Sequence, residues 1–466
     1  MSQVINRDIE TGSPLLRDSE SERAMLEDAA ARVLARARAG GADAAEVSVS
    51  SSHGRNVTVR LGEIDVLEDA RDRGVSVTVY INRASGSAST GDLGAESLER
   101  AVDQALAIAR HTQPDPAGGL APAELMASRI EDFDQWHPRE LDMATLIERA
   151  KLIEQAGMDA DARIENSEGA SVSADAAIGV YANSHGFVGS GRSTRFDQSC
   201  VLVARDKSGM QRDWDWDDQG RFEALADPAT TGRKAAERAV RRLGARSAPS
   251  GRTPVLFDNN VALGLVRHLV GAVSGGNLYR RSSFLLDAVG KRLFPEWVRI
   301  DEDPHLPGGA RSSSFDSEGV ATRQQPLIEA GVLQRYVLGS YSARKLGLQT
   351  TANAGGVRNL LFSPGTRSFD ELVAEMGRGL VVTEVMGQGV NLVTGDYSRG
   401  ASGFWVEEGR IAYPVEEITI AGNLRDMFAG LVEAGSDLET RRNIQVPSLL
   451  LDGMTVAGQQ AEGDPE

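Results

Sequence analysis

The sequence is poor in cysteine and in long apolar runs, and each shortage excludes a class of protein. Cys200 is the single cysteine, so neither an intrachain disulfide nor a cysteine-rich zinc or iron–sulfur site can form. No apolar run approaches the roughly 18 residues that span a bilayer. Residues 1–26 are polar and lack the apolar core of a signal peptide. We therefore expect a cytoplasmic protein with no membrane partner.

Positive charge is also in short supply. The 50 lysines and arginines are outnumbered by 67 aspartates and glutamates, which gives a net charge of −17. Contacts to a phosphate backbone need a basic face, so a nucleic-acid partner is not expected. The 41% of hydrophobic residues is typical of a soluble globular chain. A length of 466 residues predicts two or three domains.

The N-terminal part alternates between the two apolar periodicities. Residues 1–20 are predicted to form a disordered tail, and residues 22–39 have helical spacing that ends at Gly40 and Gly41. A period of two, typical of strands with one buried face, then appears several times. The predicted strands are 45–51, 55–61, 64–71, 74–81 and 83–89. A helix near 96–111 follows, so this part is predicted to be an α/β layer with an antiparallel meander.

The same alternation continues to a linker. Helices are predicted near 143–156 and 230–243, with strands at 163–174, 178–183, 187–195 and 198–207 between them. Residues 245–253 form the best linker candidate. We therefore predict an N-terminal α+β domain over 21–247 and a β-rich C-terminal domain over 248–466. The helices expected in the second domain are Val261–Val273, Ser342–Lys345 and Phe369–Met376. The fold class is α+β.

Few residues could carry chemistry by themselves. The six histidines are scattered, and no two are spaced to place a pair of imidazoles on one helix face. No serine lies in a G-x-S-x-G elbow. The glycines at 387–389 and 275–276 continue neither as a P-loop nor as a dinucleotide fingerprint, and tight turns explain them better.

The stretch 383–423 is predicted to be a series of strands with glycines at the turns. Residues 404–406 and 410–415 flank a turn at 407–409, which predicts a hairpin. Asp396, Tyr397 and Arg399 could offer charge and an aromatic face to a peptide that adds to an open strand edge. An ordinary core hairpin with a salt-bridged rim explains the same residues equally well.

Several long motifs resemble the PmbA/TldE family, whose members are also called modulators of DNA gyrase. The longest is MGQGVNLVTGDYSRGASGFWVEEGRIAYPVEEITIAGNL at 386–424. The others are HLVGAVSGGNLYRRSSFLL at 268–286, FDSEGV at 315–320, GSYSARKLGL at 339–348, VYANSHGF at 180–187 and GSAST at 86–90. The resemblance covers roughly residues 22–460 in one order.

The resemblance implies a subunit that lacks its own metal site. Family members pair with a sibling, TldD, which carries zinc on an H-E-x-x-x-H helix. Here the two histidine positions hold Arg267 and Ala272, and the glutamate position holds His268. Residues 443–447 contain no counterpart of the sibling's cysteine. Arginine stays protonated and alanine has no ligand atom, so no cofactor is expected in this chain, with zinc in the TldD-type partner. Arg267 is expected to pair with an acid of its own fold.

Three hypotheses follow. The first is a non-catalytic subunit of a heterodimeric zinc peptidase that helps to form a chamber for unfolded or leader peptides. The second is a homodimeric peptide-binding or chaperone-like module without hydrolysis. The third is an independent hydrolase that uses Asp316, Glu318, Asp396 and His268.

Overall fold

The computed structural model of the chain describes residues 18–458, which divide into two compact units. Unit 1 contains the described residues up to Gln113, then Gln135–Val203 and Asp213–Arg238. Unit 2 contains Pro114–Asp134, Ala204–Arg212 and the described residues from Ala239 onward. The sequence predicts a single boundary after residue 247, whereas two earlier segments also belong to unit 2. Of the tail predicted at 1–20, residues 1–17 lie outside the described residues, and the first described helix begins at Ser19.

One arginine shows how the first of these segments is attached to unit 2. The Arg344 guanidinium donates hydrogen bonds to the carbonyl oxygens of Ala117, Gly119 and Leu120, at 2.6, 2.6 and 3.1 Å. Backbone carbonyls in an irregular segment need such donors when no strand or helix supplies them.

Unit 1 is built on one six-stranded sheet with the strand order β3-β2-β1-β4-β5-β6. The strands are β1 Ala44–Arg60, β2 Glu63–Ile81, β3 Ala84–Thr90, β4 Ile164–Asn183, β5 Val188–Asp206 and β6 Gly209–Gln219. β1 pairs antiparallel with β2 from Ala44↔Tyr80 to Arg60↔Glu63. The predicted strands 45–51 and 55–61 are therefore one strand, because its polar middle, Ser51 to Arg55, stays in the ladder.

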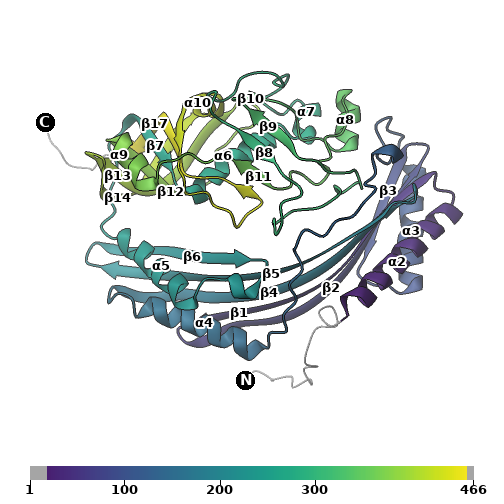
Figure 1. Cartoon of the computed structure of the whole chain (residues 1–466), viewed down its shortest axis with the longest axis horizontal. Helices are drawn as coiled ribbons and strands as arrows, with labels where there is room; N and C mark the ends of the chain where they lie inside the picture. Colours follow the sequence, from purple (N-terminus) through teal and green to yellow (C-terminus); the bar gives the residue numbers. More distant parts are fainter. Residues whose placement is uncertain (1–17, 459–466) are drawn as a thin grey trace. The chain divides into compact units, whose positions relative to one another are not determined.

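Four helices cover unit 1: α2 Ser19–Ala39, α3 Ala95–His111, α4 Met143–Met158 and α5 Pro228–Arg241. Alternate residues of β1 face them. Val47 and Val49 belong to the core under α2 and α3, and Val57 and Val59 are fully buried farther along. α4 contacts β1 and β4 (Figure 1). The predicted layer of helices on an antiparallel meander is confirmed.

Five strands of unit 2 close into a ring, because β14 pairs with β17 as well as with β13. They are β7 Gly251–Phe257, β12 Gly379–Met386, β13 Asp396–Glu407, β14 Arg410–Asn423 and β17 Leu449–Gly458 (Figure 1). β15 Leu431–Ala434 adds to β17. The predicted hairpin is confirmed: Glu407 pairs with Arg410 across a turn whose Glu408 and Gly409 have φ of 49° and 71°.

A smaller sheet with the order β10-β9-β8-β11-β16 completes the strands of unit 2. Its members are β8 Ile300–Glu302, β9 Gln325–Glu329, β10 Val332–Leu333, β11 Leu360–Phe362 and β16 Ile444–Gln445. The helices of unit 2 are α6 Asn259–Ala272, α7 Gly275–Tyr279, α8 Ser340–Leu346, α9 Phe369–Met376 and α10 Leu424–Ala429. The β-rich character predicted for this part, with a few helices, is confirmed.

A buried carboxylate organises the irregular segments around the smaller sheet. Glu302 is 1% exposed and forms an ion pair with Arg335. It also accepts hydrogen bonds from Asn353 Nδ2, at 2.8 and 3.0 Å, and from the Arg358 backbone amide at 2.6 Å. Burial lowers the pKa of Arg335, and the Glu302 carboxylate opposes that shift. Unit 2 therefore has a polar network inside its apolar core.

Among residues 18–458, no helix is both long enough and apolar enough to cross a bilayer.

Candidate functional site

The helix that carries positions 267, 268 and 272 is α6, which follows β7 directly. Asp258 caps its first turn by accepting a hydrogen bond from the Asn260 amide at 2.9 Å. At its other end, the Gly271 carbonyl accepts hydrogen bonds from Ser274 Oγ at 2.9 Å and from Asn277 Nδ2 at 2.8 Å. Both ends are therefore fixed by side chains, and α6 holds its exposed positions rigidly.

The three positions have different surroundings. Ala272 is completely buried in the core of unit 2. Arg267 is exposed and has no ion pair with any residue in the part of the chain that the structure describes. The acid expected to pair with Arg267 is therefore not found among residues 18–458, where its side chain leaves the buried face of α6.

His268 is half-buried and lies against a tyrosine from β13. The rings of His268 and Tyr397 are 6.1 Å apart between centroids and nearly perpendicular, at 77°. Burial lowers the pKa of His268, and the positive charge of Arg399 lowers it further. The imidazole is therefore held in its neutral form near pH 7.

Asp396 and Tyr397, two of the residues predicted to contact a peptide, lie at the start of β13 but face different surroundings. Asp396 is exposed and accepts hydrogen bonds from Thr394 Oγ1 at 2.6 Å and Asn423 Nδ2 at 3.1 Å, which lower its pKa. Tyr397 is only 3% exposed, and burial raises its pKa to about 12. Adjacent strand residues point to opposite faces. Tyr397 therefore does not offer its ring to a peptide at the surface, as the sequence suggested, and packs into the core.

The strand edge predicted for peptide binding is also occupied. β12 and β14 pair with β13 on its two sides. Where β12 ends, the segment 387–395 continues the pairing, and the Ser398 amide donates to the Gly389 carbonyl oxygen at 2.6 Å. A Cβ on Gly389 would lie 1.9 Å from the Ser398 carbonyl oxygen, which explains this glycine as a close backbone approach. Arg399 donates from Nε to the Met386 carbonyl oxygen at 3.0 Å.

Asp316 and Glu318, two carboxylates of the independent-hydrolase hypothesis, accept hydrogen bonds from backbone amides. Asp316 is 1% exposed and accepts hydrogen bonds from the amides of Glu318 at 2.9 Å, Val320 at 3.0 Å and Ala354 at 3.0 Å. Burial raises the pKa of Asp316 to about 6. Glu318 accepts a hydrogen bond from the Ser340 amide at 2.8 Å. Both side chains fix loops. Among the described residues the predicted site therefore falls into separate groups: His268 lies with Tyr397 and Arg399, and Asp316 lies with Glu318.

The donor set does not fit a resident metal ion. Within residues 18–458 no three histidine, cysteine, aspartate or glutamate side chains are gathered as ligands would be. A zinc peptidase needs about three such ligands and an open position for water. Arg267 and Ala272 supply none of them.

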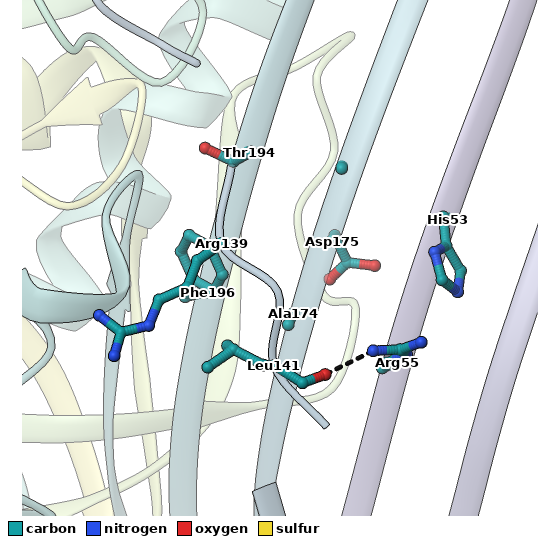
Figure 2. Close-up of a pocket in the computed structure, with 9 residues that line it drawn as sticks. His53, Arg55, Arg139, Leu141, Ala174, Asp175, Thr194 and Phe196 are labelled. Atoms are coloured by element: carbon teal, nitrogen blue, oxygen red, sulfur yellow. Dashed lines mark hydrogen bonds between the residues drawn. The ribbon is translucent and has the colours of Figure 1, made fainter. Parts of the chain in front are cut away.

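A second polar cluster lies on the sheet of unit 1, and the sequence did not predict it. His53 Nε2 lies 2.6 Å from Asp69 Oδ1, and Arg55 Nε donates to Asp69 Oδ2 at 2.8 Å. Arg55 also donates to the Leu141 carbonyl oxygen (Figure 2). Partial burial raises the pKa of Asp69, but the hydrogen bonds from Arg55 and His53 outweigh it and lower the pKa below its ordinary value.

Figure 2 shows that His53 and Arg55 line a pocket together with residues of β4, β5 and the segment at Arg139–Leu141. Asp69 of β2 lies beside this pocket and offsets the charge of Arg55, and the lining itself also contains Arg139 and Asp175. We interpret the cluster as a structural link between the two apolar parts of this face. Only the register of the β1–β2 hairpin brings Arg55 opposite Asp69, and that register is not visible in local sequence.

Comparison with known proteins identifies the class of this fold. Residues 45–109, 136–243 and 250–458 match, in that order, domain 1, the central domain and the C-terminal domain of the PmbA/TldA metallopeptidases. The chain belongs to this metallopeptidase family.

Full-length relatives narrow the assignment to the PmbA branch. The chain is 46% identical to the metalloprotease PmbA of Escherichia coli O157:H7 over 440 residues, which cover 94% of this chain and 98% of that protein. It is 43% identical to a PmbA homologue of Haemophilus influenzae, with 96% and 99% coverage.

Solved structures agree with the fold. A candidate modulator of DNA gyrase from Bacteroides thetaiotaomicron superposes with a TM-score of 0.89 at 27% identity, covering 93% of this chain and 99% of that one. TldE from Thermococcus kodakarensis superposes with a TM-score of 0.81 at 21% identity, covering 92% and 100%.

Proposed function

We propose that this chain is the metal-free, non-catalytic subunit of a cytoplasmic, two-subunit zinc peptidase of the TldD/TldE type. It helps to form the chamber for unfolded or leader peptides, and hydrolysis takes place at the zinc of a TldD-type partner. The observation that carries the proposal is the chemistry of α6, where Arg267, His268 and Ala272 occupy the positions that bear ligands and base in the sibling.

The surroundings of these residues support the proposal. The Arg267 cation at a ligand position would repel Zn²⁺ electrostatically. Burial and the Arg399 cation lower the pKa of His268, and its ring packs against Tyr397. Water activation by zinc needs a nearby base that accepts the proton, and Asp316 and Glu318 are committed to backbone amides.

The experiment compares the chain alone with the chain co-expressed with an HExxxH-bearing sibling from the same genome. Zinc is measured by mass spectrometry, and cleavage is measured on an unfolded casein substrate. We expect less than about 0.1 zinc per lone chain, no cleavage by it, and a co-purifying complex that cleaves and loses activity on chelation. Stoichiometric zinc together with cleavage in the lone chain would contradict the proposal.

A further inference from the structure

Besides the end strands β3 and β6, a stretch of β2 in the unit 1 sheet also has a strand partner on one side only among the described residues. β1 pairs with β2 along its whole length, but β3 pairs only with Val75–Ile81. Residues Glu63–Gly74 of β2, here called the free edge, therefore lack a neighbour on their outer side among the described residues. Strands that expose unpaired amides and carbonyls over such a length are templates for another chain.

Apolar side chains accompany the unpaired backbone. Leu61, Ile64 and Leu67 are 57%, 47% and 54% exposed. Ile64 lies opposite Val59 and Leu67 opposite Val57, so both share a face with valines that are fully buried. The apolar surface under the helices of unit 1 therefore continues outward past β1, to a margin where it is left uncovered.

The hairpin end beside the free edge is held rigidly. The Glu154 carboxylate, 2% exposed, accepts hydrogen bonds from the amides of Leu61 and Gly62, both at 2.8 Å. A partner would thus meet a preformed edge and lose little conformational entropy in ordering it.

Charge identifies the kind of chain that fits. The free edge carries five carboxylates, Glu63, Asp65, Glu68, Asp69 and Asp72, and only two arginines, Arg71 and Arg73. Arg73 is already paired with Glu22 at 3.0 Å, and Asp69 with Arg55 at 2.8 Å, which leaves four carboxylates and Arg71. An incoming strand with basic and apolar side chains complements this edge.

A second copy of this chain fits poorly. When two copies of β2 pair antiparallel about a two-fold axis, each residue lies opposite a residue of the other copy on the same face of the sheet. The two residue numbers of every such pair then add up to the same even number. The register that places Asp69 against Arg71 twice also places Glu68 against Asp72 twice, so the like-charge pairs offset the opposite-charge pairs. In a register centred on Glu68, Asp69 or Arg71, that residue lies directly opposite the same residue of the second copy. Like charges directly opposite one another are destabilising.

We propose that the free edge of β2 is the docking surface for the TldD-type partner, which adds a strand rich in basic and apolar side chains. This inference rests on the proposed function, and it assigns the association of the two subunits to unit 1.

The test uses the full-length chain and its HExxxH-bearing sibling, with affinity measured by titration calorimetry. Leu67→Glu places a charge in the centre of the apolar margin and should weaken the complex about 10- to 100-fold. Val188→Glu is the matched control, because Val188 is 52% exposed on β5 and lies away from β2. It should change the affinity less than about 2-fold.

Glu68→Lys tests the charge argument. It should weaken the complex with the sibling. In the self-pairing register described above, the substitution also replaces a like-charge pair with an opposite-charge pair against Asp72, so it should promote dimers of the chain alone in sedimentation. Hydrogen exchange supplies an independent readout: outward amides in Glu63–Gly74 should become protected only in the complex.

The outcomes separate the two proposals. A complex that forms with unchanged affinity in Leu67→Glu and Glu68→Lys overturns the docking surface and leaves the proposed function intact. A dimer of the native chain that Leu67→Glu dissociates overturns the choice of partner. Faster exchange at Glu63–Gly74 after removal of residues 1–17 from the lone chain would mean that the chain covers its own edge. Failure to form any complex overturns both proposals.

Discussion

The two units differ in whether the edges of their main sheets are closed or open. Unit 2 closes β7, β12, β13, β14 and β17 into a ring, which leaves none of those strands at an outer margin of the sheet. In unit 1, Glu63–Gly74 pairs with β1 on one side and has no strand on its outer side among residues 18–458. The closed unit contains α6, and the open unit contains the free edge that we propose as a docking surface.

The interiors differ as well. Unit 2 buries a charged network at Glu302 and a protonatable acid at Asp316, whereas the core cluster under α2 and α3 of unit 1 is aliphatic. Elsewhere unit 1 also buries charged side chains, among them Glu154 and Arg55. Four measurements would test this contrast.

The largest effect is expected from Glu302→Ala. The change leaves the buried Arg335 cation without its carboxylate, and breaking such a pair costs about 3–5 kcal/mol. Urea unfolding followed by near-ultraviolet circular dichroism measures the loss. Asp301→Ala is the control, because Asp301 pairs with the half-exposed Arg299 and should cost about 0.5 kcal/mol. Equal losses would mean that the network contributes little to unit 2.

The next largest effect is expected from pH, which should change the stability of the two units in opposite directions. The folded pKa of Asp316 is about 6 against an ordinary 3.8, so the folded state binds this proton more tightly. The stability contributed by Asp316 is therefore present below about pH 4 and is lost as the pH rises to about 6, by at most about 3 kcal/mol.

The stability difference between the native chain and Asp316→Asn should decline over that range. Asp69 in unit 1 has a lowered pKa and behaves in the opposite sense, losing stability as the pH falls below its ordinary value. A difference that is flat from pH 4 to pH 6 would count against the elevated pKa of Asp316.

Two helical glycines offer a matched pair across the units. A Cβ at Gly232 of α5 would lie 2.0 Å from the Ile153 carbonyl oxygen of α4, whereas a Cβ at Gly264 of α6 would meet nothing within 4 Å. Gly232→Ala should destabilise unit 1 by about 2 kcal/mol through overpacking. Gly264→Ala should be neutral or stabilise unit 2 by up to about 1 kcal/mol. Thermal unfolding of both variants would show whether the helix crossing in unit 1 is as tight as described.

Arg267→Ala should have the smallest effect on stability, within about 0.5 kcal/mol, because the side chain is exposed and unpaired among the described residues. Chemical denaturation at two salt concentrations measures it. A loss above about 1 kcal/mol would indicate a partner for Arg267 that the described contacts do not contain.

Much of the fold was predictable from periodicity alone, and the errors have physical causes. The helix predicted at 261–273 coincides closely with α6, since its apolar residues recur at helical spacing and Asp258 caps it. β6 was missed because its sequence, GMQRDWDWDDQ, is rich in aspartate, which is depleted in strands. α7 and α10 were missed because they are short and have little room for any period.

The site was harder to predict than the fold. The residue types at positions 267, 268 and 272 were visible in the sequence. The burial of Tyr397 was not, because the face of β13 that points inward depends on pairing partners about 25 residues away and on the ring as a whole. The free edge of β2 depends on where β3 stops, which local sequence does not mark.

The pairing that closes the ring has a consequence for synthesis. β7 begins at Gly251, but its neighbour β17 ends at Gly458, so more than 200 residues must be translated before that side of β7 acquires its strand. Every strand of unit 1 has left the ribosome by then, and domains generally fold in the order in which they emerge. A stalled or truncated chain would therefore present a finished N-terminal layer beside an incomplete barrel with an apolar strand exposed. Loss of β17 should consequently make a nascent chain dependent on chaperones, whatever the fate of its other contacts.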